Sequence, residues 1–119
     1  MHIAMINIKN LRLRTYIGFN PEELEKQQDI IINAEVHYPA DTASTTDNEA
    51  DAVNYKVITK RMIQFVEHGR FKLLEKLVAD LLEIAMEHPD VRYARVTVDK
   101  PHALRFADSV SITMEDRRS

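Results

Sequence analysis

The spacing of the hydrophobic residues changes twice along this chain, and this change constrains the fold more than any other feature. Apolar and polar residues alternate over residues 3–16 and 29–39, as they do in strands with one buried face. Between residues 54 and 85 the apolar residues recur every three or four positions, which is typical of amphipathic helices. Alternation returns over residues 91–100 and 109–114. The order strand, strand, helix, helix, strand, strand predicts an α+β fold.

The first predicted strand contains a change of phase. Ile6 and Ile8 fall on positions of one parity, whereas Leu11 and Leu13 fall on the other. Side chains alternate between the two faces of a strand, so a flip across residues 9–10 requires an extra residue there. We therefore expect a β-bulge or kink in the middle of this strand.

The two predicted helices have clear ends. The first begins after Asn54, a residue that often caps helix N-termini, and stops at Gly69. The second ends before Pro89 and carries a continuous apolar stripe. The stripe consists of Leu74, Leu77, Val78, Leu81, Leu82 and Ala85. We expect the acidic residues 41–51 to form a surface loop and residues 20–26 to form a polar connection.

Two hairpins that flank a pair of helices predict a four-stranded antiparallel sheet with both helices on one face. The length suits a single domain over residues 1–119 with a modest core. Edge strands of such a sheet expose unpaired backbone groups and need covering. Pairing with the edges of other subunits would cover them, so we expect a ring-forming homo-oligomer.

Composition excludes several classes of protein. A net charge of -3 argues against a generic nucleic-acid binder. The absence of cysteine removes disulfides and thiolate metal sites, and the five histidines lack ligand spacing, so we expect no metal. Two glycines are too few for a glycine-rich phosphate loop. No apolar run approaches the roughly 18 residues of a membrane helix, and no targeting segment is evident, so we expect a cytoplasmic protein.

Four residues with useful chemistry stand at separated positions, namely Glu23, Tyr55, Glu75 and Lys100. Two carboxylates, a phenol and an ammonium can bind a polar heterocycle and move protons. Each residue also has an ordinary explanation. Glu23 lies in a charged run, and Glu75 begins a helix whose dipole favours a carboxylate. Tyr55 can be an aromatic at a helix start and Lys100 a protective edge lysine, so both explanations stay open at this point.

The segments around these residues resemble one family. They are Tyr16-Ile17-Gly18 followed by Glu23 and Gln28, then Val53-Asn54-Tyr55, Leu73-Leu74-Glu75 and Lys100. In this order and spacing, across the whole chain, they resemble the dihydroneopterin aldolases and their epimerase relatives. The resemblance implies a tunnelling fold (T-fold), a small-molecule pterin substrate and no cofactor. It also implies tetramer rings, with an octamer expected, and active sites at subunit interfaces.

Three further segments are most similar to the epimerase branch of that family. They are residues 9–15, 37–41 and 102–111, and family aldolases generally lack the pattern His102-Ala103-Leu104-Arg105. This similarity implies epimerisation of carbon 2' of dihydroneopterin triphosphate through reversible retro-aldol cleavage. Three alternatives remain: an aldolase that releases 6-hydroxymethyl-7,8-dihydropterin and glycolaldehyde, a non-catalytic pterin-binding module, and a structural oligomer without a ligand.

The resemblance also implies a role for each residue. Lys100 is expected near N5 of the pterin, and Tyr55 is expected to act as acid and base near the side-chain hydroxyls. Glu23 is expected to contact the hydroxylated side chain from a neighbouring subunit. Glu75, with Leu74 beside it, is expected to accept the two adjacent N–H donors of the pterin edge. A triphosphate also needs cationic partners in an acidic chain, and we expect Arg14, His102 and Arg105 to supply them. Arg14 can equally be a solvated charge on the face of its strand.

Overall fold

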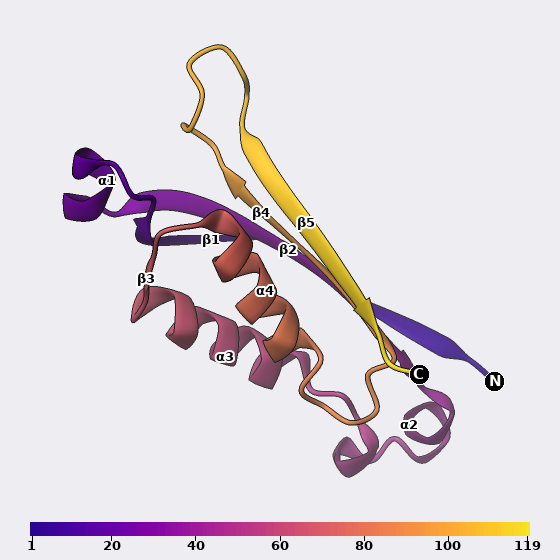
Figure 1. The fold of residues 1–119 in the computed structure, drawn as a ribbon. Coiled ribbons are helices and arrows are strands. Elements are labelled where there is room, and N and C mark those ends of the chain that lie inside the picture. The colour runs from indigo at the N-terminus through magenta and orange to yellow at the C-terminus, as the bar shows by residue number, and fades with distance from the viewer.

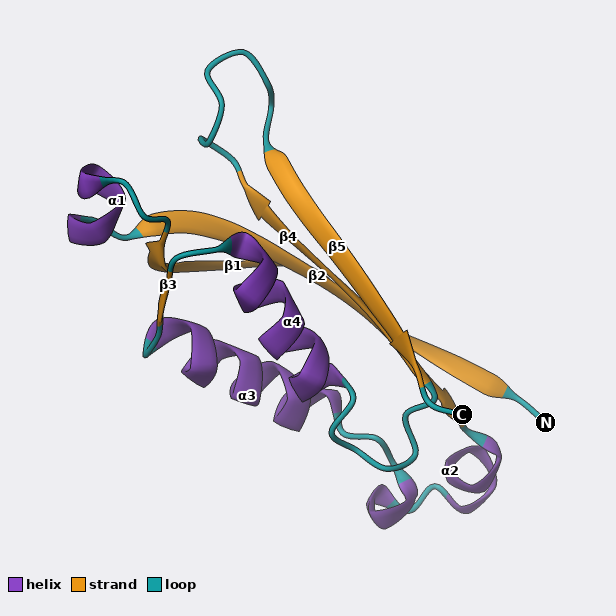
Figure 2. Ribbon diagram, in the orientation of Figure 1, coloured by secondary structure: helices purple, strands orange, loops and turns teal.

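A twisted sheet forms one layer of the molecule, and two helices cover one of its faces (Figures 1 and 2). The computed structural model describes residues 1–119. The strands are β1 (Ile3–Ile17), β2 (Gln28–Pro39), β3 (Arg70–Phe71), β4 (Tyr93–Lys100) and β5 (Val110–Arg117). The helices are α1 (Pro21–Glu25), α2 (Asp41–Thr46), α3 (Tyr55–Glu67) and α4 (Leu74–Ala85), with a 3-10 turn, η1, over Glu49–Asp51. The covering helices are α3 and α4.

The sheet has five strands in the order β3-β1-β2-β4-β5. The four long strands pair antiparallel, as the sequence predicts. The predicted four-stranded sheet is nevertheless incomplete, because β3 adds a parallel pairing to the end of β1 and makes the sheet mixed. A strand of two residues is too short to show an alternation of apolar and polar residues, so the sequence pattern could not reveal β3.

The predicted bulge in β1 is confirmed. The register of β1 against β2 shifts between Ile8 and Leu11, and Asn10 takes a positive φ of 53°. The side-chain oxygen of Asn33 accepts a hydrogen bond from the backbone N–H of Asn10 at 2.9 Å. Asn tolerates left-handed backbone better than most residues. The bulge keeps Leu13 on the same face of the sheet as Ile8 despite their opposite parity.

The hydrophobic core lies between the sheet and α3 and α4. Both predicted helices are confirmed, and the side chain of Asn54 caps α3 by accepting the N–H of Lys56 at 2.9 Å. Side chains that are fully buried in this layer include Ile30, Ile32 and Val36 of β2, Val96 and Val98 of β4, Met62 and Val66 of α3, and Leu77, Val78 and Leu81 of α4. None of the helices is long and apolar enough to cross a membrane.

The prediction of a loop over residues 41–51 is wrong, because this segment forms α2 and η1. Its Ser and Thr residues favour caps and turns over helix interiors, so local composition gave no helix signal. Here the hydroxyls of Ser44 and Thr45 bond within the helix, and both donate to the backbone carbonyl of Asp41, at 3.0 and 2.9 Å.

The two ends of the molecule differ in what they hold. One end contains α1, β3 and the loop between β4 and β5, and the other contains α2 and both chain termini (Figure 1). Helix α3 runs from the α2 end towards β3 (Figure 1). Because β4 ends and α4 begins near α1, the ends of these elements meet at the same end of the molecule.

Candidate active site

A close ion pair links the end of β4 to α1. The ammonium nitrogen of Lys100 lies 2.9 Å from Oε2 of Glu23, and the two side chains are only 14% and 20% exposed. The fold brings these residues together although 77 positions separate them in the sequence. A partly buried pair of this kind is a candidate for proton transfer.

Several hydrogen bonds fix the carboxylate of Glu23. Asn20 caps α1 and accepts the backbone N–H of Glu23 at 3.0 Å. The side-chain amide of Gln28 donates to Oε2 of Glu23 at 3.1 Å and to the carbonyl of Ile17 at 2.5 Å. The hydrogen bond from Lys100 holds the pKa of Glu23 below its ordinary value, with help from Gln28 and against the effect of partial burial.

The expectation that Glu23 reaches the site from a neighbouring subunit is wrong. Glu23 and Lys100 of the same chain are already in contact, at 2.9 Å. The neighbouring subunit was taken from the family resemblance, because a polar connection by itself does not show where it folds back. The turn of α1, which begins at Pro21, returns Glu23 to the end of β1 and thereby to Lys100.

The lowered pKa of Glu23 predicts a pH dependence of stability. The unfolded carboxyl binds a proton at higher pH than the folded one, so the pair stabilises the fold fully above the unfolded pKa. This contribution is lost as the pH falls below the ordinary glutamate pKa and then through the lower folded pKa. We expect Glu23→Gln to flatten the fall in unfolding free energy over this range, measured by urea denaturation.

The matched control is Glu87→Gln, which removes a carboxylate from the more exposed pair with Arg61. Exposed pairs contribute little to stability. If both variants keep the same acid-induced loss as the parent, the Glu23–Lys100 pair does not carry this dependence.

Helix α4 presents its N-terminus at the same end of the molecule. The backbone N–H of Gly18 donates to the carbonyl of Phe71 at 2.8 Å, which places the start of α4 a few residues from α1. Glu75 is exposed in the first turn, whereas the side chain of Leu74 is buried in the core. No side chain caps the first N–H groups of α4. A ligand here would meet a carboxylate and free N–H donors together.

Tyr55 lies far from Lys100 within one chain. It starts α3, and the other end of α3 is Glu67, which lines a cavity together with His102. Twelve helical steps of 1.5 Å separate Tyr55 from Glu67 by about 18 Å along the helix. The side chain of Tyr55 is 55% exposed. The structure therefore groups Glu23, Lys100 and Glu75 at one end and leaves Tyr55 near the other.

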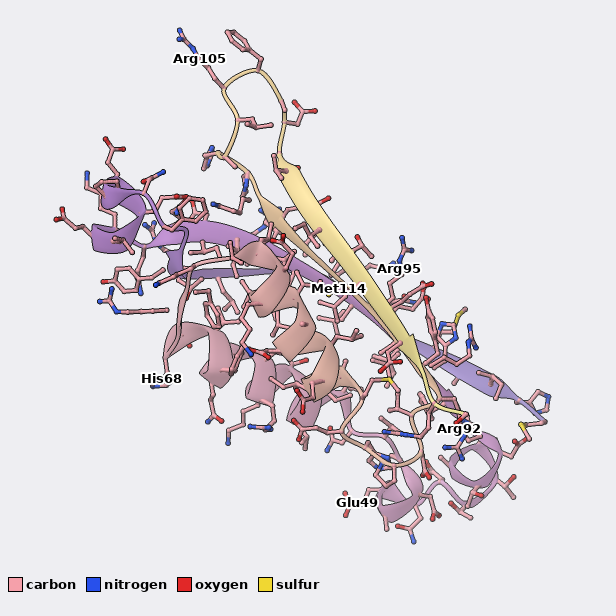
Figure 3. All side chains as sticks on the ribbon, viewed as in Figure 1. Glu49, His68, Arg92, Arg95, Arg105 and Met114 are labelled. Atoms are coloured by element: carbon pink, nitrogen blue, oxygen red, sulfur yellow. The ribbon has the colours of Figure 1, made fainter.

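Two of the three expected phosphate ligands adjoin the ion pair. Arg14 and His102 line a cavity of about 770 Å³, and a smaller hollow of about 200 Å³ connects both to Lys100. Asp29 lies between them, 3.4 Å from Arg14 and 4.0 Å from His102. Arg105 is elsewhere, at the tip of the loop between β4 and β5, and its side chain points away from the sheet (Figure 3).

Sequence reasoning assigned no role to Gln28 or Asp29. Gln28 holds the Glu23 carboxylate, and Asp29 places a negative charge beside Arg14. Both begin β2 within a polar run, where nothing distinguishes them from solvated residues. No group of three or more His, Asp or Glu side chains is placed to hold a metal ion. The site as built can bind a polar ring and exchange protons with it.

Comparison with known proteins agrees with this geometry. The family model described as dihydroneopterin aldolase matches residues 6–115. The chain is 57% identical to dihydroneopterin triphosphate 2'-epimerase of Escherichia coli over 97% of its length and 96% of that protein. It is 51% identical to the epimerase of Pseudomonas aeruginosa, over 98% and 94% of the two chains.

A solved structure gives the same picture of the fold. Dihydroneopterin aldolase of Escherichia coli, in complex with neopterin, superposes with a TM-score of 0.89 at 25% identity, covering 95% of this chain and 98% of that one. The aldolase is thus more distant in sequence than the epimerases, although its backbone is nearly the same. On these grounds the chain belongs to the dihydroneopterin aldolase family.

Proposed function

We propose that this chain is an isomerase that epimerises carbon 2' of the side chain of 7,8-dihydroneopterin triphosphate, giving dihydromonapterin triphosphate. The observation that carries the proposal is the Glu23–Lys100 pair, which lies at the same end of the molecule as Glu75. The identity of 57% to an epimerase over nearly the whole chain supports this activity over that of the more distant aldolases.

The chemistry needs a path other than simple deprotonation of carbon 2'. That C–H bond has no adjacent group to accept its electrons. When the bond between carbons 1' and 2' breaks instead, the C6=N5 imine of the dihydropterin accepts the electron pair. A base removes the 2'-hydroxyl proton, the carbon–carbon bond breaks, and an aldehyde forms beside an enamine. Re-addition to the opposite face of the aldehyde inverts carbon 2', and the base returns the proton.

The residues at the site suit these steps. Lys100 is the proposed donor near N5, where the imine nitrogen gains electron density during cleavage. Tyr55 is the proposed acid and base at the side-chain hydroxyl. Glu23 pairs with Lys100, which lines the smaller hollow, and from there it can orient the hydroxylated side chain.

Glu75 is the proposed anchor of the pterin ring. A carboxylate can accept the two adjacent N–H donors of a 2-amino-4-oxo pteridine in a bidentate pair. We expect Glu75→Ala to weaken neopterin binding by roughly 1.5–3 kcal/mol, the usual value of hydrogen bonds to charged groups. Stability should change little, because Glu75 is exposed. Calorimetric titration checks the affinity.

Glu83→Ala is the matched control, since Glu83 is also an exposed carboxylate on α4 but lies in its last turns. Equal affinities of the Glu75→Ala variant and the parent would remove Glu75 from the site.

The distance between Tyr55 and Lys100 within one chain supports an oligomer. If both act on one substrate, Tyr55 must come from a second copy of the chain. Strands β3 and β5 are the edges of the sheet, and edges invite pairing with another subunit. We therefore propose a closed ring whose sites lie between subunits, with two rings in an octamer. Sedimentation equilibrium at micromolar concentration measures the assembly, and a stable monomer contradicts it.

Product analysis tests the activity itself. The purified chain is incubated with dihydroneopterin triphosphate, and the dephosphorylated products are resolved by chiral chromatography. The epimer is expected as the main product. If 6-hydroxymethyl-7,8-dihydropterin dominates instead, the chain is an aldolase, the alternative that the close backbone match to the Escherichia coli aldolase favours. Binding without turnover would leave a pterin-binding module.

The cationic side chains beside Lys100 are expected to set the ratio of epimer to 6-hydroxymethyl-7,8-dihydropterin. In an epimerase the aldehyde fragment carries the triphosphate and must stay bound until it re-adds. Each charged phosphate contact is worth roughly 1.5–3 kcal/mol, so losing one speeds escape about tenfold or more. We expect Arg14→Ala to shift the product ratio towards 6-hydroxymethyl-7,8-dihydropterin. An unchanged ratio together with an unchanged KM would remove Arg14 from the phosphate site.

The variant Arg105→Ala tests whether Arg105 binds the triphosphate in addition to Arg14. Arg105 lies on a projecting loop, so it can reach a triphosphate only where that loop meets a bound substrate of the assembled ring (Figure 3). We expect a shift in the same direction as for Arg14→Ala in the assembled ring. If Arg14→Ala shifts the product ratio and Arg105→Ala does not, the triphosphate is held only in the cavity beside Lys100.

A further inference from the structure

We infer that Gly18 is a positioning residue for the reaction, because the space left by its missing side chain holds the carboxylate of Glu23. This inference rests on the proposed function and adds to it which residues aim the carboxylate. Gly18 directly follows β1, and α1 returns the chain so that Glu23 lies against the α-carbon of Gly18. No side chain at residue 18 could share that space.

The geometry at Gly18 is specific to glycine in two ways. A Cβ added at residue 18 would overlap the carboxylate carbon and both carboxylate oxygens of Glu23. The φ of Gly18 is +129°, a backbone conformation that L residues rarely adopt. The first property concerns Glu23 alone, whereas the second concerns the backbone. The two effects can therefore be separated by changing Glu23.

Gly18 and Gln28 together form the seat of the Glu23 carboxylate, that is, the two residues that hold it in place. The hydrogen bond from Gln28 makes the two carboxylate oxygens of Glu23 unequal. Oε2 of Glu23 accepts from Lys100 at 2.9 Å and from Gln28 at 3.1 Å. Oε1 takes part in none of the hydrogen bonds of the structure. One oxygen is thus committed to the ammonium, and the other is free to accept a hydrogen bond from a hydroxyl group of the substrate. Gly18 and Gln28 together determine which oxygen is free.

A displaced carboxylate would affect turnover more than binding. The pterin ring is anchored elsewhere, at the start of α4, so its affinity does not depend on the seat. We expect Gln28→Met, which keeps the length of the side chain without its donors, to lower kcat for epimerisation about tenfold or more with KM within about threefold. We also expect the acid limb of the kcat/KM profile to move to higher pH, because Glu23 loses a hydrogen bond that lowers its pKa.

Shortening residue 23 provides the decisive test of Gly18. Aspartate is one methylene shorter than glutamate and withdraws from the added methyl group of Gly18→Ala. We expect Glu23→Asp to lower kcat in the parent but to raise it about fivefold or more in the Gly18→Ala background, a reversal of sign that marks direct coupling. If Glu23→Asp lowers kcat by the same factor in both backgrounds, Gly18 acts on the backbone only and the inference fails.

A second measurement does not require epimerase activity. The carboxyl carbon of Glu23 is titrated by carbon-13 NMR in the parent, in Gln28→Met and in Gly18→Ala. We expect its pKa to rise in both variants towards the ordinary glutamate value. If the pKa of Glu23 is unchanged in both variants, Gly18 and Gln28 do not hold its carboxylate, and this conclusion stands even if the chain is an aldolase. Absence of epimerisation with the expected titration overturns the proposed function but leaves the seat intact.

Discussion

Replacing Lys100 by methionine is expected to abolish both epimerisation and aldol cleavage, with kcat falling about a thousandfold. Methionine retains most of the aliphatic length, so the change removes the ammonium with little loss of packing. General acid–base groups typically contribute 10²–10⁴-fold to rate, and Lys100 would serve the cleavage that both reactions share. Chromatography of both products under single-turnover conditions measures the effect.

The proportions of the two products distinguish this prediction from a general loss of fold. Loss of Lys100 should suppress them together, whereas loss of a phosphate contact should redistribute them. Lys9→Met is the control, because Lys9 is an exposed lysine of β1 outside the proposed site. If Lys100→Met lowers only one of the two products, Lys100 does not act at the shared cleavage step.

Mixing two inactive variants is expected to restore activity, which is the second large effect. Tyr55→Phe and Lys100→Met should each be nearly inactive, because each lacks one proposed proton-transfer group. In a ring where Tyr55 of one subunit faces Lys100 of the next, random mixing of equal amounts gives intact sites at about a quarter of the interfaces. Activity should therefore rise from a trace to roughly a quarter of the parent value.

The experiment depends on exchange of subunits, so the two chains are co-expressed with different tags and purified through both. A double variant, Tyr55→Phe with Lys100→Met in one chain, mixed with the parent, gives a matched control. Tandem-purified hetero-oligomers with no more activity than the separate variants would place Tyr55 and Lys100 in the same chain's site or remove Tyr55 from it. The separation of about 18 Å along α3 argues against the first outcome.

Local patterns predicted the elements whose residues repeat. The phase change between Ile8 and Leu11 identified the bulge, because a strand has only two faces. Asn54 and the apolar stripe of α4 identified both covering helices, since capping and helical spacing are short-range properties. These features are encoded within one or two turns of chain, and sequence reasoning reads them directly.

Contacts between distant segments were harder to predict. Strand β3 exists because Arg70 and Phe71 pair with Tyr16 and Ile17 at the end of β1, which no pattern in residues 70–71 reveals. The side chain of Glu23 meets Lys100 only after α1 folds back, so its subunit of origin was misassigned. The candidate residues themselves came from family resemblance, since none differs in type or spacing from ordinary surface residues.

The loop between β4 and β5 gives the family a place to diversify. Residues 102–108 are all exposed, and the loop is closed at its base by Ser109, whose hydroxyl donates to Asp99 at 2.9 Å. Since these seven positions bury nothing, mutations there can accumulate at little energetic cost to the fold. A change of substrate preference can therefore arise in this one hairpin tip without disturbing the carboxylate of Glu23 and the ammonium of Lys100 beneath it.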